Sequence, residues 1–188
     1  DVLRDDDVQL TLFLLYANWY GSVPALSADL EWDLELLETR AVLERAVESA
    51  LREQVAVPQL PEPTVDAVAR GLFALADDDH GPSLSRYVAQ TATAEQLGEL
   101  LVHRSVYTLR AADPHSSAIP RLTGRSKAAL VEIQSDEHGG GRPDRVHATL
   151  FASAMRGVGL DDTYAAYVDD VPAITLAAHN VMSLLGLQ

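Results

Sequence analysis

The side chains best suited to chemistry in this sequence are those of Glu137 and His147, which lie ten positions apart. Between them, residues 139–143 read Gly-Gly-Gly-Arg-Pro, a break that separates two apolar helical patterns. A carboxylate and an imidazole that point inward from adjacent helices can bind a transition metal such as iron. The same two groups can also form a hydrogen-bonded pair without any metal. Their spacing alone leaves both interpretations open.

Helical spacing places both side chains on apolar faces. Glu137 continues the face that carries Leu130 and Ile133, and His147 shares a face with Leu150. We therefore expect both groups to point toward the core. A buried carboxylate or charged imidazole is costly unless it is paired or bound to a metal. The two interpretations therefore both predict that these side chains have a partner.

Composition limits the classes of function. The chain has 188 residues, of which 47% are hydrophobic, and its formal net charge of −14 disfavours nucleic acids and anionic membranes as partners. It contains no cysteine, so any metal must use histidine and carboxylate ligands, which suit iron, manganese or zinc. No apolar run approaches the ~18 residues of a membrane-spanning helix, and the first residues do not form a signal peptide. We expect a cytoplasmic protein.

Helix signals dominate the elements that must position this pair, and no segment is typical of a strand. Asp33 and Thr64 stand at N-cap positions, and Thr93 with Gln96 has the capping-box pattern. The chain is predicted to be a single all-α domain over 1–188, with N-terminal helices in 1–92 and core helices in 93–188. The predicted helices cover residues 8–20, 33–53, 64–76, 83–90, 93–112, 123–138, 143–156, 163–168 and 173–187.

The helix predicted over 173–187 is apolar on every face, which is typical of a helix buried on all sides. A chain of this length offers it too few partners. We expect either a homodimer or a second chain packed on this helix, or a natural protein that continues beyond residue 188. Its His179 is read as a core or interface histidine. His138, at the end of the preceding pattern, is read as complementing a negative helix end.

Three segments carry a resemblance to a known family. They run from Val102 to Tyr107, from Ala112 to Leu122 and from Lys127 to Pro143, and shorter similar stretches lie at 31–33 and 81–87. These segments resemble the actinobacterial iron-containing redox enzymes of the haem-oxygenase-like diiron oxidase superfamily. The resemblance implies a haem-oxygenase-like helical bundle that binds one or two non-haem irons through three histidines and three carboxylates.

Carried over position by position, the resemblance implies that Glu137 and His147 are metal ligands. The family's first glutamate should fall near Asp113, where Ala111 stands instead. A glutamate is also expected near Tyr16, and Ala17 is found there. The remaining histidine and aspartate ligands of the family are expected beyond residue 188.

Two functions follow from the resemblance. The first is an iron- and dioxygen-dependent oxidoreductase that acts on a small molecule in specialised metabolism. The second is a degenerate, non-catalytic relative that binds a partner or a ligand through its apolar C-terminal helix. Ala111 discriminates between them, because its substitution for a ligand leaves at best a mononuclear or weakened iron site.

Overall fold

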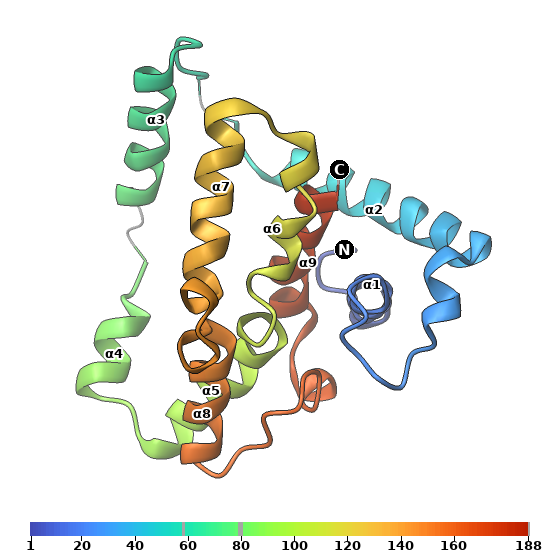
Figure 1. Ribbon diagram of the computed structural model, residues 1–188, viewed down its shortest axis with the longest axis vertical. Helices are drawn as coiled ribbons and strands as arrows, with labels where there is room; N and C mark the ends of the chain where they lie inside the picture. Colours follow the sequence, from blue (N-terminus) through green and yellow to red (C-terminus); the bar gives the residue numbers. More distant parts are fainter. Residues whose placement is uncertain (58, 79–80, 188) are drawn as a thin grey trace.

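The computed structural model describes residues 1–57, 59–78 and 81–187, and within these ranges it contains helices and no strand (Figure 1). The all-α prediction is confirmed. The helices are α1 (Asp6–Trp19), α2 (Leu34–Gln54), α3 (Val65–Asp77), α4 (Leu84–Gln90), α5 (Ala94–Thr108), α6 (Asp113–Ser116), α7 (Gly124–Glu137), α8 (His147–Gly157) and α9 (Ala173–Leu187). Single 3-10 turns lie at Ala28–Trp32, Ile119–Arg121, Gly139–Gly141, Pro143–Arg145 and Val168–Asp170.

Capping residues start the helices of the N-terminal half as the sequence predicts. The side chain of Asp33 accepts from the backbone N–H groups of Glu35 and Leu36, and Thr64 caps α3. Thr93 and Gln96 form the reciprocal capping box of α5. Each cap satisfies backbone donors that have no partner within the helix, which fixes where the helix begins.

Two predicted helix boundaries and one predicted helix are wrong, and all three errors lie in the C-terminal half. The helix that begins at 94 ends at Thr108 rather than 112, and a turn then leads into α6. The helix expected over 143–156 begins only at His147, because Val146 is extended at ψ 126°. The segment 163–168 contains no α-helix: residues 163–167 form a bend and turns, Val168 begins a 3-10 turn, and Ala165 has a φ of +65°. Local turns outweigh helical periodicity in these short segments.

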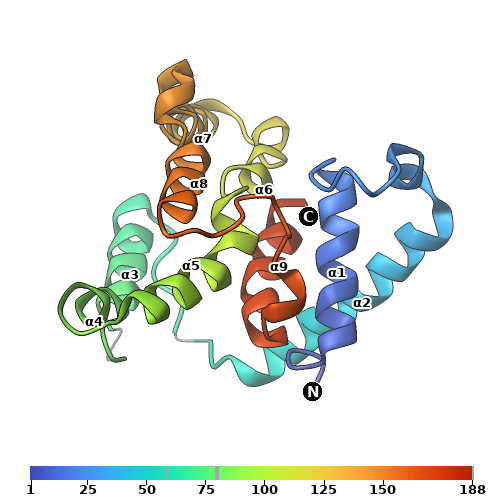
Figure 2. The same ribbon diagram turned by 90° about the horizontal axis from the view of Figure 1, so that it is seen from below.

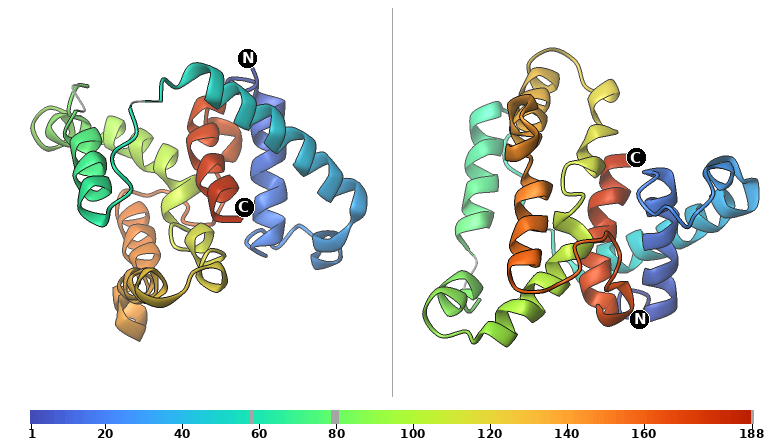
Figure 3. Two further views of the ribbon diagram at one scale, coloured as in Figure 1. Left: turned by 90° about the horizontal axis from the view of Figure 1, so that it is seen from above. Right: turned by 60° about the horizontal axis from the view of Figure 1, so that its bottom comes forward.

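The main core lies where α1 and α9 run side by side and α2 crosses them (Figures 2 and 3). Leu12, Val47 and Leu184 join these three helices in one buried cluster. A polar contact also crosses the core, since the side-chain amide of Asn180 donates to the backbone oxygen of Gln9 at 2.9 Å and to its side-chain oxygen at 3.0 Å. Segments from opposite ends of the sequence therefore share one core.

Helix α9 is buried on most of its surface but not on all sides. It packs against α1, α5 and α6, whereas Ile174 and Leu185 are 47% and 71% exposed. Gly186 lies so close to α6 that an added Cβ would be 2.2 Å from the carbonyl oxygen of Pro114. The expectation that α9 is buried on every side is therefore wrong for the face that carries Ile174 and Leu185. The close contact with Gly186 fixes the position of α6.

Helix α3 stands at the periphery of the molecule (Figure 1) and leaves apolar side chains in solvent, with Val65 83% and Phe73 72% exposed. No helix among the residues that the structure describes is long and apolar enough to cross a membrane. The division into helices 1–92 and 93–188 of one domain stays a prediction.

Candidate metal centre

Two helix ends bring Glu137 and His147 together. Glu137 is the last residue of α7 and His147 the first residue of α8, and the His147 Nδ1 lies 3.0 Å from the Glu137 Oε2. A carboxylate can only accept, so Nδ1–H donates this hydrogen bond when Glu137 is ionised. The sequence prediction that the two residues belong to adjacent helices is confirmed, and their contact is direct.

The loop between the two helices is closed by glycine. Gly139 has a φ of +65°, a conformation that costs a residue with a side chain. A Cβ at this position would also lie 2.6 Å from the backbone carbon of Arg145. Because only glycine permits this approach, the chain can return within nine residues and start α8 beside the end of α7.

Buried contacts hold the two helices in place. Gln134, one turn before the end of α7, donates from its side-chain amide to the Ala112 carbonyl at 3.0 Å. On α8, Met155 is fully buried, and this helix packs against α5. These contacts anchor the pair from both sides.

The pair itself lies near the surface rather than in the core. The side chain of Glu137 is 29% exposed and that of His147 is 47% exposed, and Leu150 on α8 is 53% exposed. The predicted inward orientation is therefore wrong. Its physical reason is the late start of α8, which places His147 at a helix end and not within an apolar stripe.

A cavity of about 160 Å³ adjoins Glu137. Ala111 lies in its wall, so the alanine that stands where the resemblance implies a glutamate faces the same space as Glu137. The residues on both sides of His147 also contribute to it. The full lining comprises Leu109, Arg110, Ala111, Ala112, Asp113, Glu137, His138, Val146 and Ala148.

Charges around the cavity are partly balanced. Arg110 forms an ion pair with Asp113 at 3.4 Å, and both line the wall. Among the described residues, the partner of Glu137 is His147 at 3.0 Å rather than a lysine or arginine. After burial, the negative charge of Glu137 is the second cause that raises the pKa of the nearby Tyr107. The field in this region is therefore that of the Glu137 carboxylate, which favours a cation.

His138 was read from the sequence only as complementing a helix end, yet it lines the cavity beside Glu137. Its Nδ1 lies 2.8 Å from the Gln134 carbonyl oxygen. A carbonyl can only accept, so Nδ1 carries the proton and Nε2 is the atom left to exchange protons or bind a ligand. The sequence signal for this role of His138 is its position four residues after Gln134, which places its ring near the Gln134 carbonyl at the end of the helix.

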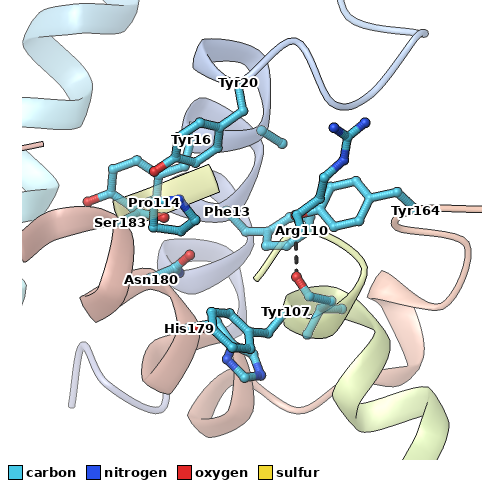
Figure 4. A pocket seen from close by; sticks show the side chains of 12 residues that line it. Phe13, Tyr16, Tyr20, Tyr107, Arg110, Pro114, Tyr164, His179, Asn180 and Ser183 are labelled. Carbon is cyan, nitrogen blue, oxygen red and sulfur yellow. Dashed lines mark hydrogen bonds between the residues drawn. The ribbon is translucent and has the colours of Figure 1, made fainter. Parts of the chain in front are cut away.

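A second, smaller cavity of about 20 Å³ lies between α1, α5 and α9, and four of its twelve lining residues are tyrosines (Figure 4). Ala17 lies in this wall. The ring of His179 stacks on Tyr107 with 5.0 Å between centroids. Burial, and then the charge of Arg104, lower the pKa of His179 to about 4. His179 is partly buried, and whether it is a core or an interface histidine stays a prediction.

The donor set fits part of a metal site. The 3.0 Å between the Glu137 Oε2 and the His147 Nδ1 is a hydrogen-bond distance, and a metal bound to both atoms would replace that hydrogen bond. Carboxylate with imidazole is a ligand pair that suits iron. In the described part of the chain, however, no group of three or more histidine, aspartate or glutamate side chains could hold a metal ion.

The fold and the pair define an all-α protein with a carboxylate and an imidazole on adjoining helices. Residues 98–188, just under half of the chain, match the family described as iron-containing redox enzyme. The resemblance to the haem-oxygenase-like superfamily is confirmed over these residues, which include Ala111, Glu137 and His147. The similarity seen at 31–33 and 81–87 stays a prediction. No curated protein matches the chain.

Proposed function

We propose that this chain contributes to a non-haem iron centre of a dioxygen-dependent oxidoreductase that acts on a small molecule in specialised metabolism. Glu137 and His147 are the proposed ligands. The observation that carries the proposal is their 3.0 Å contact beside a cavity of about 160 Å³, within the part that matches an iron-containing redox family.

Iron bound at this pair would supply the redox chemistry with dioxygen. The chain supplies the surroundings of that chemistry. Glu137 offsets part of the metal charge, and Leu109, Val146 and Ala148 provide an apolar wall that excludes water and holds a small molecule. His138 Nε2 is the atom at this wall that can hold or release a proton. Because Ala111 offers no donor, we propose one iron rather than two at this pair.

The first test is stoichiometric iron binding. The protein is loaded with Fe(II) without oxygen, and bound iron is measured by elemental analysis. We expect iron in the wild type, its loss in Glu137→Ala and in His147→Ala, and its retention in Glu132→Ala. Glu132 is a matched control because it lies on the same helix and is exposed. Equal iron in all four proteins would exclude this pair as the site.

A second proposed function is a partner-binding relative without iron chemistry. It is favoured by Ala111 in the cavity wall and by the exposed Ile174 and Leu185 of α9, on which a second copy or another chain would pack. We expect such a protein to sediment as a homodimer, and Leu185→Lys to convert it to monomer. A monomeric wild type that binds iron would reject this function. The proposal includes a cytoplasmic location for either function.

A further inference from the structure

Two apolar surfaces of this chain lie open, one on α3 and one beside α9. The α3 stripe comprises Val65, Val68, Leu72 and Leu75, and the α9 groove is a cavity of about 590 Å³ between α4, α5 and α9. We propose that two copies of this chain form a dimer in which the α3 stripe of each copy occupies the α9 groove of the other. This inference rests on the second proposed function, in its form with a second copy, and it names the element that covers α9.

The α3 stripe has the spacing of a helix that docks in a groove. Its four residues follow one another at intervals of three, four and three, which places them on one side of the helix. Val65 is 83% and Leu72 63% exposed, and within the described ranges α3 has only sparse contact with the other helices. Leu72 and Leu75 also face an open apolar cavity of about 840 Å³ beside Pro61 of the preceding connector. The side chains of the same copy therefore leave the stripe uncovered.

The α9 groove offers an apolar wall of matching length. Leu84 of α4, Leu100 of α5 and Ile174 of α9 line it, and Leu84 and Ile174 are 56% and 47% exposed. On α9 the open face continues from Ile174 to Leu185, which spans about 16 Å at ~1.5 Å per residue. The α3 stripe, from residue 65 to 75, spans about 15 Å on the same basis. One helix can therefore cover the whole open face of the other.

Charge favours the α3 of a second copy as the occupant. Helix α3 ends in Asp77 and Asp78, beside the negative end of its dipole, where carboxylates are unfavourable without a cation. Glu99 and Arg104 line the groove, so its charges cancel although the chain carries −14. Arg104 contacts the ring of Tyr107 at 6.0 Å and has no ion pair in the part of the chain that the structure describes. We expect Arg104 of one copy to lie at the acidic end of α3 of the other.

The exchange is reciprocal. Helix α4, which lines the groove, follows α3 in the chain, and both stand on the same side of the molecule (Figures 1 and 2). A twofold axis through this side makes two identical contacts. Each contact then has to bury only about half of the ~1,600 Å² of a standard interface.

Sedimentation velocity tests both sides of the contact. The wild type is a dimer at about 50 μM, and Leu72→Asp and Ile174→Asp each raise its dissociation constant about 100-fold, because each places a carboxylate among apolar side chains. Phe73→Asp is the matched control, since Phe73 is 72% exposed but lies outside the stripe, and it leaves the dimer intact. Circular dichroism confirms that each variant is folded.

Charge reversal tests the orientation. Arg104→Glu raises the dissociation constant about tenfold, and Asp77→Arg with Asp78→Arg in the same chain restores it. Arg125→Glu, at an exposed position of α7, has no such effect. A loss in Arg104→Glu that the two arginine substitutions do not reverse separates α3 from Arg104 and rejects the exchange.

Cross-linking tests the contact directly, because the sequence contains no cysteine. Copies with Leu72→Cys are mixed with copies with Ile174→Cys, and a short bismaleimide is added. A cross-linked dimer forms in this mixture and not when Phe73→Cys replaces Leu72→Cys. Equal cross-linking in the two mixtures rejects the stripe as the contact.

The outcomes separate this inference from the second proposed function. A dimer that Leu185→Lys dissociates and Leu72→Asp leaves intact rejects the exchange and keeps the function. A monomeric wild type overturns both.

Discussion

Two carboxylate pairs in this protein have the same separation and opposite surroundings. The Tyr16 hydroxyl donates to Glu44 at 3.0 Å between α1 and α2, and His147 donates to Glu137 at 3.0 Å between α7 and α8. The side chain of Glu44 is 10% exposed and has Arg40 at 3.6 Å, whereas that of Glu137 is 29% exposed and lies beside a cavity.

The difference in exposure shows that different parts of the structure hold the two pairs in place. Burial and the Glu44 charge strongly raise the pKa of Tyr16, so its hydroxyl remains the donor over the accessible pH range. The first pair is therefore part of the packed core. The second pair is set by a glycine loop and two helix ends, and solvent or a ligand can reach it. The first contributes stability, and the second is available for binding.

Truncation of a core side chain should show the largest contrast between the two regions. Leu12 is 1% exposed in the α1 core, whereas Leu150 of α8 is 53% exposed. We expect Leu12→Ala to lower the free energy of unfolding by about 2–5 kcal/mol and Leu150→Ala by less than about 0.5 kcal/mol. Urea denaturation checks both. Equal losses would show that the α8 region is as tightly packed as the core.

The contact between α9 and α6 gives the next effect. Gly186→Ala would force a Cβ against the Pro114 carbonyl, and we expect a loss of about 1–3 kcal/mol in the free energy of unfolding. Gly98→Ala is the matched control, because nothing lies within 4 Å of a Cβ there and alanine favours the helix. Thermal unfolding of both variants gives the comparison; a stabilised Gly186→Ala would disprove the close contact.

The two carboxylate pairs can then be broken one at a time. Tyr16→Phe leaves the buried Glu44 without one donor, which should cost about 1–2 kcal/mol. Glu137→Gln weakens an exposed pair, which should cost less than about 1 kcal/mol. Chemical denaturation at neutral pH measures both losses. A larger loss for Glu137→Gln would reverse the assignment of structural and binding roles.

The smallest effect is a dependence on pH through His179. Its pKa is lowered to about 4 in the folded state, against 6.5 for a free side chain, so the unfolded chain binds a proton that the folded chain does not. Stability from this residue is therefore complete above about pH 6.5 and falls as the pH decreases toward 4. Because the ring is partly exposed, we expect a loss of about 1 kcal/mol.

His179→Phe isolates this contribution, because phenylalanine can stack on Tyr107 but does not titrate. Free energies of unfolding are compared at pH 7 and pH 4.5. We expect the wild type to lose about 1 kcal/mol more than the variant over this interval. Parallel losses would mean that His179 is solvated in the folded protein.

The helix positions in the N-terminal half were predictable because caps are local signals. Asp33, Thr64 and Thr93 start α2, α3 and α5 through contacts within a few residues. The C-terminal end of α5 and the start of α8 were not predictable in the same way. These boundaries depend on turns and on the hydrogen bond from Gln134 to the Ala112 carbonyl. Helical periodicity in the sequence does not indicate either of these features.

For the candidate site, the sequence predicted the two residues and their place on adjacent helices, but not their exposure. Glu137 and His147 continue apolar patterns, yet the faces of α7 and α8 that carry these patterns remain partly open, with Ile133 and Leu150 more than half exposed. The cavity at Ala111 and the orientation of His138 arise from tertiary contacts, so no local pattern could predict them.

The packing of α1 against α9 also determines how long the newly made α1 must wait during translation for its partner helix. From Trp19 to Ala173 the ribosome must add 154 residues before α1 meets its partner, which takes roughly 10–30 s at common elongation rates. During that time Leu12 and Phe13 lack the part of their burial that Leu184 and Leu176 of α9 provide. Premature release of the nascent chain would therefore produce an aggregation-prone fragment, even though most of its helices had already formed.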